Sequence, residues 1–431
     1  HNAPLCLSNR EAKRRLNDMA DLFLFHDRDI VVRVDDSVIF PALPGKANAL
    51  SSMVRRARGF VPTPLILSRL DDGKGFQSIY AAGAELKSTF CLTRKKAIFV
   101  SQHIGDLTHA ECMDFYAATL DHLQKILEVS PQAVVCDKHP DYASHIFARS
   151  FAQKRQIPLF ALQHHAAHIY AVMAEHDICH PVLGMALDGS GFGDDGTIWG
   201  GELLRMDGEK WRRMGRFSPF PLPGGEAAIK SPWRVASGLW LQNGLTGIPP
   251  WQKSHGQAMP MLQQMIARNV NCPLTSSCGR LFDAVAALAG GCFDITYEGQ
   301  AAIRLEQLQN HSEQGSYVLP IKQNQGLIEA DAHAFFRQAA QDMDQPHNMA
   351  RRFHRGLAEG LSAWARHAAD STGIKQIVLA GGVFNNRTLL SETQSCLVSK
   401  GLTPVVPSAY PAGDGSIALG QAYWGTLMRM A

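Results

Sequence analysis

Short apolar strands that run directly into glycine turns recur along this sequence of 431 residues. Residues 79–91 are expected to form a strand, a turn of small residues and a second strand, and residues 185–202 a longer β-hairpin with a glycine-rich tip. A third apolar strand, within residues 377–386, ends in Gly381 and Gly382. Because glycine lets backbone amides approach an anion without an intervening side chain, each turn is a candidate binding site for a phosphate or a flat base. Strands separated by helical segments in this way predict an α/β fold.

A pair of histidines lies on a predicted helix between the first two hairpins. Residues 162–172 are rich in alanine and contain neither glycine nor proline, which predicts a helix. His164 and His168 are four residues apart, so their imidazoles project from one helix face and can hold one metal ion. Ordinary histidines on a half-buried helix are the alternative, and a carboxylate ligand would favour the metal. Asp188, at the end of the second hairpin's first strand, and Asp414, in a late turn with glycine on either side, are the candidates.

Further positions in the glycine turns are candidates for contacts with a nucleotide. Glycines follow Asp188, but no helix follows them, and the chain has no Gly-Lys-Ser or Gly-Lys-Thr sequence. The segment is therefore neither a dinucleotide fingerprint nor a Walker loop, and a plain glycine-rich hairpin is the alternative. Asp283, early in a predicted helix over residues 276–290, either accepts hydrogen bonds from ribose hydroxyls or merely complements the helix dipole.

The composition is that of a globular enzyme without a strong charge bias. Hydrophobic residues make up 45% and charged residues 19%, and the formal net charge of +3 gives no sign of a nucleic-acid track. Nine cysteines without a Cys-x-x-Cys pair suit a reducing cytoplasm, and no apolar run approaches the length of a membrane span. The densest basic run, Arg55, Arg56 and Arg58, suits a phosphate or carboxylate ligand, although a basic linker is the simpler interpretation. The chain begins at His1 in sequence typical of the middle of a domain, so we expect a fragment of a longer protein.

The arrangement of these segments resembles the actin, hexokinase and heat-shock-ATPase superfold, in which two α/β lobes clasp a nucleotide. In that resemblance residues 79–91 and 185–202 are the phosphate hairpins, and residues 377–386 are the adenosine turn. A small-molecule kinase is one class of protein with this fold. The histidine pair argues against a kinase, because kinases of this fold hold Mg²⁺ through carboxylates and water, whereas imidazole suits iron, zinc or similar ions.

Several motifs that occur in the same order along the chain resemble HypF, the carbamoyltransferase family of nickel-iron hydrogenase maturation. They are the histidine helix, Gly-Ala-Glu-Leu-Lys-Ser-Thr-Phe at residues 83–90, Asp-Lys-His-Pro-Asp-Tyr at 137–142, Ser-Cys-Gly-Arg-Leu-Phe-Asp-Ala-Val at 277–285, and Pro-Ala-Gly-Asp-Gly at 411–415. The resemblance implies a chain of three parts. They are the C-terminal part of a YrdC-like α/β domain (residues 1–65), a linker (66–75) and a Kae1-like carbamoyltransferase domain (76–431), whose two lobes span about 76–180 and 181–431.

The resemblance also implies a reaction. A HypF-type protein makes carbamoyl-adenylate from carbamoyl phosphate and ATP. Its Kae1-like domain then passes the carbamoyl group to the C-terminal cysteine of HypE, as the precursor of a cyanide ligand. The implied cofactors are the nucleotide, as ATP or AMP, and a divalent metal ion, either iron or zinc, with magnesium as a companion of the nucleotide.

The residue roles follow from the same motifs. His164, His168 and Asp414 would be the metal ligands, and Asp188 would be a catalytic group beside them. The nucleotide would contact residues of the surrounding turns, which are Lys87, Gly189, Ser190, Gly191, Asp283, Gly381, Gly382 and Asn385.

Related activities are the alternatives. A tRNA threonylcarbamoyl transferase shares the histidine pair but would not bring the YrdC-like segment, and a natural-product O-carbamoyltransferase would have the two domains in the opposite order. A scaffold without enzymatic activity would be expected to have lost ligand positions, and all of them are filled here. We therefore expect a cytoplasmic transferase with a HypE-like protein partner and with neither a nucleic-acid nor a membrane partner.

Overall fold

The computed structural model describes residues 5–41, 52–68 and 78–428. The chain divides into two compact units. Unit 1 comprises His1–Leu162, Met173–Ile178 and Pro407–Ala431, and unit 2 comprises Gln163–Val172 and Cys179–Val406. The segment from Pro407 onward thus belongs to unit 1, whereas the sequence assigned it to the second lobe. The expected linker, residues 66–75, lies largely outside the described residues, and the boundary of a YrdC-like part at residue 65 stays a prediction.

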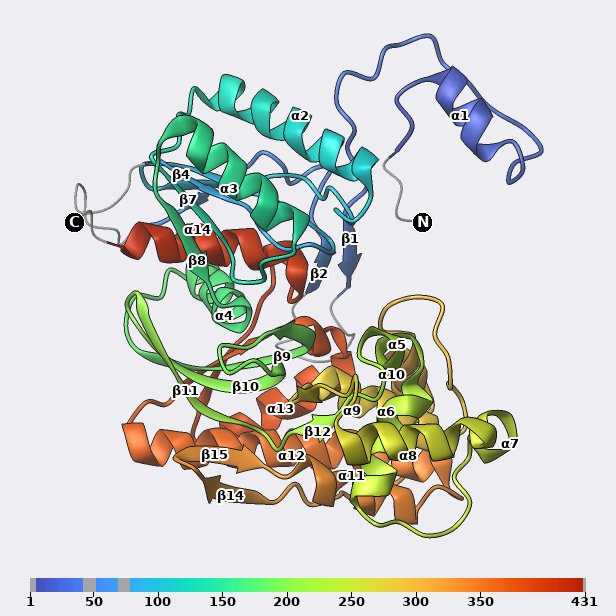
Figure 1. Cartoon of the computed structure of the whole chain (residues 1–431). Helices are drawn as coiled ribbons and strands as arrows, with labels where there is room; N and C mark the ends of the chain where they lie inside the picture. Colours follow the sequence, from blue (N-terminus) through green and yellow to red (C-terminus); the bar gives the residue numbers. More distant parts are fainter. Residues whose placement is uncertain (1–4, 42–51, 69–77, 429–431) are drawn as a thin grey trace. The chain divides into compact units, whose positions relative to one another are not determined.

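Unit 1 is built on a mixed sheet with the strand order β3-β6-β5-β4-β7-β8. Figure 1 labels β4, β7 and β8 of this sheet. Strands β4, β5 and β6 form an antiparallel meander, and β7 and β8 continue the sheet in parallel from β4. The strands are β3 (Leu65–Ile66), β4 (Ile79–Ala81), β5 (Cys91–Arg94), β6 (Ala97–Val100), β7 (Ala133–Asp137) and β8 (Leu159–Leu162). The accompanying helices are α2 (Ala110–Leu127), α3 (Ala143–Arg155) and α14 (Ile417–Leu427), with a short 3₁₀ turn η3 (Asp414–Ser416) before α14.

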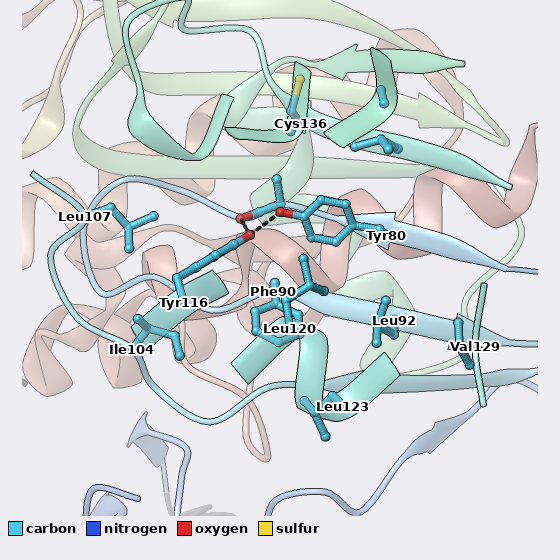
Figure 2. Close-up of a cluster of buried hydrophobic side chains, with 14 of the residues drawn as sticks. Tyr80, Phe90, Leu92, Ile104, Leu107, Tyr116, Leu120, Leu123, Val129 and Cys136 are labelled. Atoms are coloured by element: carbon cyan, nitrogen blue, oxygen red, sulfur yellow. Dashed lines mark hydrogen bonds between the residues drawn. The ribbon is translucent and has the colours of Figure 1, made fainter. Parts of the chain in front are cut away.

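A cluster of aromatic and aliphatic side chains forms a core of unit 1 (Figure 2). Helix α2 contributes to it because its apolar residues recur at helical spacing, with Tyr116 fully buried. Figure 2 shows two tyrosines from different elements that point their hydroxyls toward each other. The hydroxyls of Tyr80 and Tyr116 are 2.7 Å apart, and Tyr116 also donates to the Ala82 carbonyl at 2.7 Å. The polar atoms of this core therefore satisfy one another.

In the N-terminal segment, apolar spacing over residues 9–25 predicts a helix and the apolar run of residues 30–34 predicts a strand, and both predictions are wrong. A helix was expected from residue 9 to residue 25, but α1 (Asn9–Leu16) ends where Asn17 and Asp18, poor helix formers, follow. A strand was expected over residues 30–34, but the strands here are β1 (Val38–Phe40) and β2 (Ser52–Arg55), which pair with each other. The apolar run at 30–34 pairs with no strand among the described residues, and an isolated strand is not stable.

Unit 2 is built on a larger sheet with the order β14-β15-β11-β10-β9-β16-β17. Strands β9, β10 and β11 form an antiparallel meander, and β16 and β17 continue in parallel from β9. The strands are β9 (Val182–Phe192), β10 (Ile198–Asp207), β11 (Lys210–Phe217), β14 (Ile321–Asn324), β15 (Leu327–Ala330), β16 (Gln376–Ala380) and β17 (Thr403–Val405). Short strands β12 (Phe220–Pro221) and β13 (Leu274–Thr275) pair beside β10.

Helices of unit 2 include several whose ends are fixed by polar side chains. Ser277 caps α9 by accepting a hydrogen bond from the Arg280 amide, and Asn386 caps α13 by accepting one from the Leu389 amide. The helices are α5 (Glu226–Lys230), α6 (Pro232–Gln242), α7 (Gln252–His255), α8 (Met259–Arg268), α9 (Cys278–Leu288), α10 (Gln300–Gln307), α11 (Ala332–Gln341), α12 (Pro346–Thr372) and α13 (Arg387–Ser399), with 3₁₀ turns η1 (Gly256–Ala258) and η2 (Gly382–Asn385).

Each unit therefore repeats one topology. A three-stranded antiparallel meander is extended in parallel on the side of its first strand, as β6-β5-β4-β7-β8 in unit 1 and as β11-β10-β9-β16-β17 in unit 2. This duplicated strand order is that of the actin, hexokinase and heat-shock-ATPase superfold, and the α/β class predicted from the sequence is confirmed. No helix in the described part of the chain combines the length and apolar character needed to cross a bilayer.

Candidate metal and nucleotide site

Helix α4 (His164–Glu175) presents the two predicted histidines. Both side chains are almost fully buried. Their ring centroids lie 4.9 Å apart, and the ring planes make an angle of 84°. The Gln163 side chain fixes the start of the helix, because its Oε1 accepts a hydrogen bond from the Ala166 amide at 3.0 Å. Its Nε2 also donates to the Phe192 carbonyl at 3.2 Å, which ties the helix start to the end of β9.

Asp188, on β9, faces both imidazoles. Its Oδ2 lies 3.3 Å from His164 Nε2 and 3.2 Å from His168 Nε2. Burial alone would raise the pKa of Asp188, but the hydrogen bonds to His164 and His168 outweigh it and hold the pKa well below its ordinary value. The carboxylate is therefore ionised and acts as an acceptor.

These three side chains fit a divalent metal ion. Their candidate ligand atoms lie within 4.8 Å of one another. Atoms that coordinate one zinc-like ion at about 2.1 Å are separated by about 3.0–3.4 Å, and the two distances from Asp188 fall in that range. Two imidazoles and one carboxylate are a donor set that suits iron or zinc better than magnesium.

The neighbouring His165 points to a different environment. It is fully buried, and burial first, then the neighbouring His164, lowers the pKa of His165 well below its ordinary value. The Nδ1 atom of His165 lies 3.0 Å from Gln163 Nε2. The Nε2 atom of His165 has no hydrogen-bond partner in the described structure. His165 is thus a neutral ring that packs beside the pair.

The glycines after Asp188 were expected at the hairpin tip, but they lie within β9, since Gly191 pairs with Trp199 of β10 and the turn is formed by residues 193–197. The segment of residues 189–191, called the glycine tip below, packs against the histidines. A Cβ atom on Gly191 would lie 2.5 Å from His165 Cε1 and 3.0 Å from His164 Cδ2, so a larger residue fits only if these rings move. Gly189 is held from the other side, because Ser277 Oγ donates to the carbonyls of Asp188 and Gly189 at 2.8 and 2.7 Å. Ser190 is exposed between them.

Asp283 is buried on α9 beside a counter-ion. Its Oδ2 lies 2.8 Å from Arg280 Nη1, one helical turn earlier. Burial raises the pKa of Asp283 to about 6, although Arg280 opposes the shift. Arg280 also donates to the Ile229 carbonyl at 3.4 Å. A Cβ atom added to Gly189 would lie 3.3 Å from the Arg280 guanidinium, so the two residues are close neighbours. The pair therefore connects α9 to the glycine tip.

The late glycine turn packs directly on β9. Gly381 has φ of 100°, and a Cβ there would lie 2.2 Å from the Leu187 carbonyl oxygen. The turn η2 that contains Gly382 and Asn385 follows at once, and Asn385 Oδ1 is buried with no partner among the described residues. The unused amide oxygen is available to a ligand.

A histidine that the sequence analysis missed holds this turn. His354, on α12, is fully buried, and its Nδ1 donates to the Ala350 carbonyl at 2.7 Å. Its Nε2 must then accept from Asn386 Nδ2, at 2.9 Å, so Asn386 is fixed directly after η2. Burial lowers the pKa of His354 to about 4, which keeps the ring neutral. Ser277 and Arg280 were also missed as supports of the glycine tip, and no spacing pattern marks such partners in the sequence.

The remaining predicted residues, Lys87 and Asp414, belong to unit 1, and their roles stay predictions. The buried Cys278 at the start of α9 is not a prepared nucleophile, because burial raises the pKa of its thiol.

The duplicated α/β fold and the family models that match the chain define a Kae1-like protein. The family model described as "HypF Kae1-like domain" matches residues 74–175, and that described as "Carbamoyltransferase, Kae1-like Domain, second subdomain" matches residues 184–421. The chain belongs to the HypF family.

Individual relatives agree with this assignment. Carbamoyltransferase HypF of Rhizobium leguminosarum bv. viciae is 40% identical over 423 residues, which cover 97% of this chain and 53% of that protein. A carbamoyltransferase HypF homologue of Cupriavidus necator is 37% identical over 370 residues, 82% of this chain and 93% of that protein. A crystal structure of full-length HypF in the phosphate- and nucleotide-bound form is 35% identical with a TM-score of 0.90, and the match covers 98% of this chain and 65% of that one. The chain spans about half the length of the first relative.

Proposed function

We propose that this chain carries out the carbamoyl-transfer step of a HypF-type protein. The carbamoyl group of carbamoyl-adenylate, made from carbamoyl phosphate and ATP, would pass to the C-terminal cysteine of a HypE-like partner. The observation that carries the proposal is the convergence in unit 2 of His164, His168 and Asp188 beside the Gly191 tip. Such a cluster places a site for charge stabilisation beside bare backbone that a nucleotide can approach.

The chain's own residues have distinct roles in this proposal. The His164 and His168 imidazoles and the Asp188 carboxylate hold the metal, with Asp414 of unit 1 as a further ligand. Gly189, Ser190 and Gly191 contact the phosphate side of the nucleotide, together with Lys87 of unit 1. Iron or zinc bound there supplies a Lewis acid that makes the carbamoyl carbon more electrophilic.

The base and ribose of the nucleotide are assigned to the late glycine turn at Gly381 and Gly382 and to helix α9. Gly381 and Gly382 leave room for the base, and Asn385 offers its buried, unused Oδ1. Asp283 accepts hydrogen bonds from the ribose, in exchange for part of its contact with Arg280.

The nucleophile comes from the partner in this proposal. A thiolate attacks the carbamoyl carbon, the new C–S bond forms, and the C–O bond to the adenylate breaks so that AMP leaves with the electron pair. The thiol proton passes to solvent before the attack. Burial of Cys278 supports an external thiol, since a thiol with a raised pKa is mostly protonated at neutral pH.

The relatives support the nucleotide half of the proposal. The HypF crystal structure with the high TM-score is described as phosphate- and nucleotide-bound, and we infer the same ligand class for this chain. A tRNA threonylcarbamoyl transferase is the weaker alternative, because such an enzyme from Geobacter sulfurreducens is only 22% identical over 315 residues. The natural-product O-carbamoyltransferase alternative has no specific observation in its favour. The cytoplasmic location also stays part of the proposal.

The decisive experiment supplies carbamoyl-adenylate and a purified HypE-like acceptor to the 431-residue chain. We expect the acceptor's C-terminal peptide to gain the mass of one carbamoyl group. His164→Ala combined with His168→Ala is expected to abolish the gain and to reduce bound metal measured by elemental analysis.

The matched control is His311→Ala, which removes an exposed histidine of unit 2. It is expected to retain both transfer and metal. Failure of the metal-loaded wild-type chain to modify the acceptor would contradict the proposal for this chain.

A further inference from the structure

Unit 1 contains a pocket of about 190 Å³ with a basic lining. Its polar and charged lining residues are Arg55, Arg56, Lys87, Thr89 and His103. Among the described residues that line it, none carries a carboxylate. The pocket thus contains Arg55 and Arg56, two of the three arginines of the basic run that the sequence left open between a ligand site and a linker.

Hydrogen bonds hold the basic run against the rest of unit 1. The Met53 amide donates to the Ser408 carbonyl at 3.2 Å, and the His103 amide donates to the Arg56 carbonyl at 3.3 Å. On the other wall, Thr89 Oγ1 donates to the Gly415 carbonyl at 3.0 Å. The arginines are therefore part of a folded wall, which excludes the linker interpretation for this segment.

Arg56 is the most informative lining residue. It is only 7% exposed, and its guanidinium lies over the Tyr410 ring, 4.9 Å from the centroid. Its Nη2 donates to the carbonyls of Phe60 and Thr63 at 2.8 and 2.9 Å. Its Nη1 is buried and has no hydrogen-bond partner among the described residues. A buried guanidinium with an unused donor is costly unless a ligand or water accepts from it.

The charged groups of the lining favour an anion. Arg55 forms an ion pair with Asp35 at 3.2 Å, whereas the contacts of the Arg56 guanidinium are with neutral carbonyls and a ring. Lys87 adds another cationic side chain to the lining. Burial first, and then Arg55, lowers the pKa of His103 to about 4, while Asp35 acts in the opposite direction. His103 is therefore neutral and contributes a ring nitrogen without adding to the positive charge.

We propose that this pocket binds a small oxyanion of the phosphate type. Guanidinium forks suit tetrahedral and planar oxyanions, and the lysine adds a point charge. One water molecule occupies about 30 Å³ of liquid, so the pocket has room for a phosphate group and a few waters. The anion is either free inorganic phosphate or the phosphate group of AMP. Lys87 also belongs to the nucleotide contacts of the proposed function, so the test below includes variants of the unit 2 histidines that separate phosphate binding in this pocket from transfer.

The occupied pocket would also join two parts of the chain. Arg55 and Arg56 come from the segment that resembles the end of a YrdC-like domain, whereas Lys87, Thr89 and His103 come from the Kae1-like part. A bound anion would be contacted from both, so it would stabilise the docking of β2 in unit 1.

The test is calorimetric titration of the 431-residue chain with inorganic phosphate and, separately, with AMP. We expect saturable phosphate binding that Arg56→Gln and Lys87→Gln each weaken at least roughly tenfold. Because Arg56 also supports the Phe60 and Thr63 carbonyls, Lys87→Gln decides the question where the Arg56 variant is unfolded. AMP that competes with phosphate identifies the nucleotide's phosphate as the ligand, whereas phosphate binding without such competition identifies the free anion.

Two control variants separate this site from its surroundings. Arg58→Gln removes an arginine of the same run whose side chain is 69% exposed and paired with Asp36 at 3.5 Å, and it is expected to bind phosphate as the wild type does. The double variant of His164 and His168 is likewise expected to retain phosphate binding after losing transfer. No saturable binding of either probe, or equal weakening by Arg58→Gln, would overturn the proposal.

Discussion

The two units share a strand order but use glycine differently near the end of the first strand of the meander. In unit 1, Gly83 has φ of 77°, and a Cβ there would lie 2.0 Å from the Thr89 carbonyl oxygen, so glycine allows the connection to fold onto itself. In unit 2, Gly191 does not have a positive φ, but its Cβ would collide with the rings of His165 and His164. Glycine therefore allows a turn after β4 in unit 1 and a close contact of β9 with two histidine rings in unit 2.

The buried polar groups differ in the same way. In unit 1 the Tyr80 and Tyr116 hydroxyls and the Ala82 carbonyl satisfy one another, so the core is closed. In unit 2 two imidazoles converge on one carboxylate at distances typical of atoms that share a metal. The two tyrosines of unit 1 thus close a packed core, whereas the two histidines and the aspartate of unit 2 converge on one point.

The largest effect is expected for Gly83→Ala. The left-handed backbone and the contact with the Thr89 carbonyl should together cost about 3 kcal/mol or more in the free energy of unfolding. Gly59→Ala is the matched control, because Gly59 has φ of 87° and a Cβ added there would meet nothing within 4 Å. Urea unfolding followed by circular dichroism measures both, and equal losses would mean that the close approach in unit 1 carries no cost.

Lowering the pH is expected to reduce the stability of unit 2, because His354 becomes protonated on unfolding. The pKa of His354 is about 4 in the folded chain and about 6.5 when unfolded, so between these values only the unfolded chain binds the proton. Neutral His354 therefore contributes roughly 3 kcal/mol of stability above pH 6.5, which is lost as the pH falls toward 4.

Urea unfolding at pH 7 and at pH 4.5 measures this contribution. His354→Gln should reduce the difference in unfolding free energy between the two pH values, while His367→Gln, at an exposed position of the same helix, should leave it as in the wild type. His103 of unit 1, whose pKa is also about 4, keeps its own acid sensitivity in every variant. An unchanged pH dependence in His354→Gln would refute the assignment.

Tyr116→Phe should have a smaller effect, confined to unit 1. The change removes a hydroxyl that bonds both Tyr80 and the Ala82 carbonyl and leaves these buried groups without it, at a cost of about 2 kcal/mol. Tyr297→Phe is the control, since Tyr297 is 53% exposed. Hydrogen exchange of β4 and α2 amides locates the change, and equal effects of the two variants would show that the core is not closed by this pair.

The smallest expected change in free energy, with the largest functional consequence, is that of Gly191→Ala. The added methyl group displaces the histidine rings, so metal affinity should fall roughly tenfold, or about 1.4 kcal/mol, and transfer should fall with it. Gly291→Ala, which meets nothing within 4 Å and needs no positive φ, should leave the metal in place. Metal titration compares the two, and wild-type affinity in Gly191→Ala would mean that the tip can move away from the rings.

Periodic patterns in the sequence predicted several elements correctly, and they failed where the partners of a segment decide its structure. The helix at residues 110–127 and the buried strand at 133–137 follow from their apolar spacing. Residues 30–34 form an equally apolar run but have no strand partner in the described structure. Helix α1 ends at Leu16, although an apolar cluster follows at residues 22–25. A strand is stabilised by its neighbours, and these are not encoded within the segment itself.

For the site, helical spacing placed His164 and His168 on one face, and glycine content marked the turns beside them. Sequence proximity could not reveal that Asp188 reaches both imidazoles from another element, that Ser277 bonds two carbonyls of the tip, or that His354 holds Asn386. The sequence by itself determined the α/β class, the histidine pair, the glycine turns and, through its motifs, the family. Only the tertiary structure decided which buried groups meet, because contacts between residues far apart in the chain depend on the strand order and packing of the whole unit.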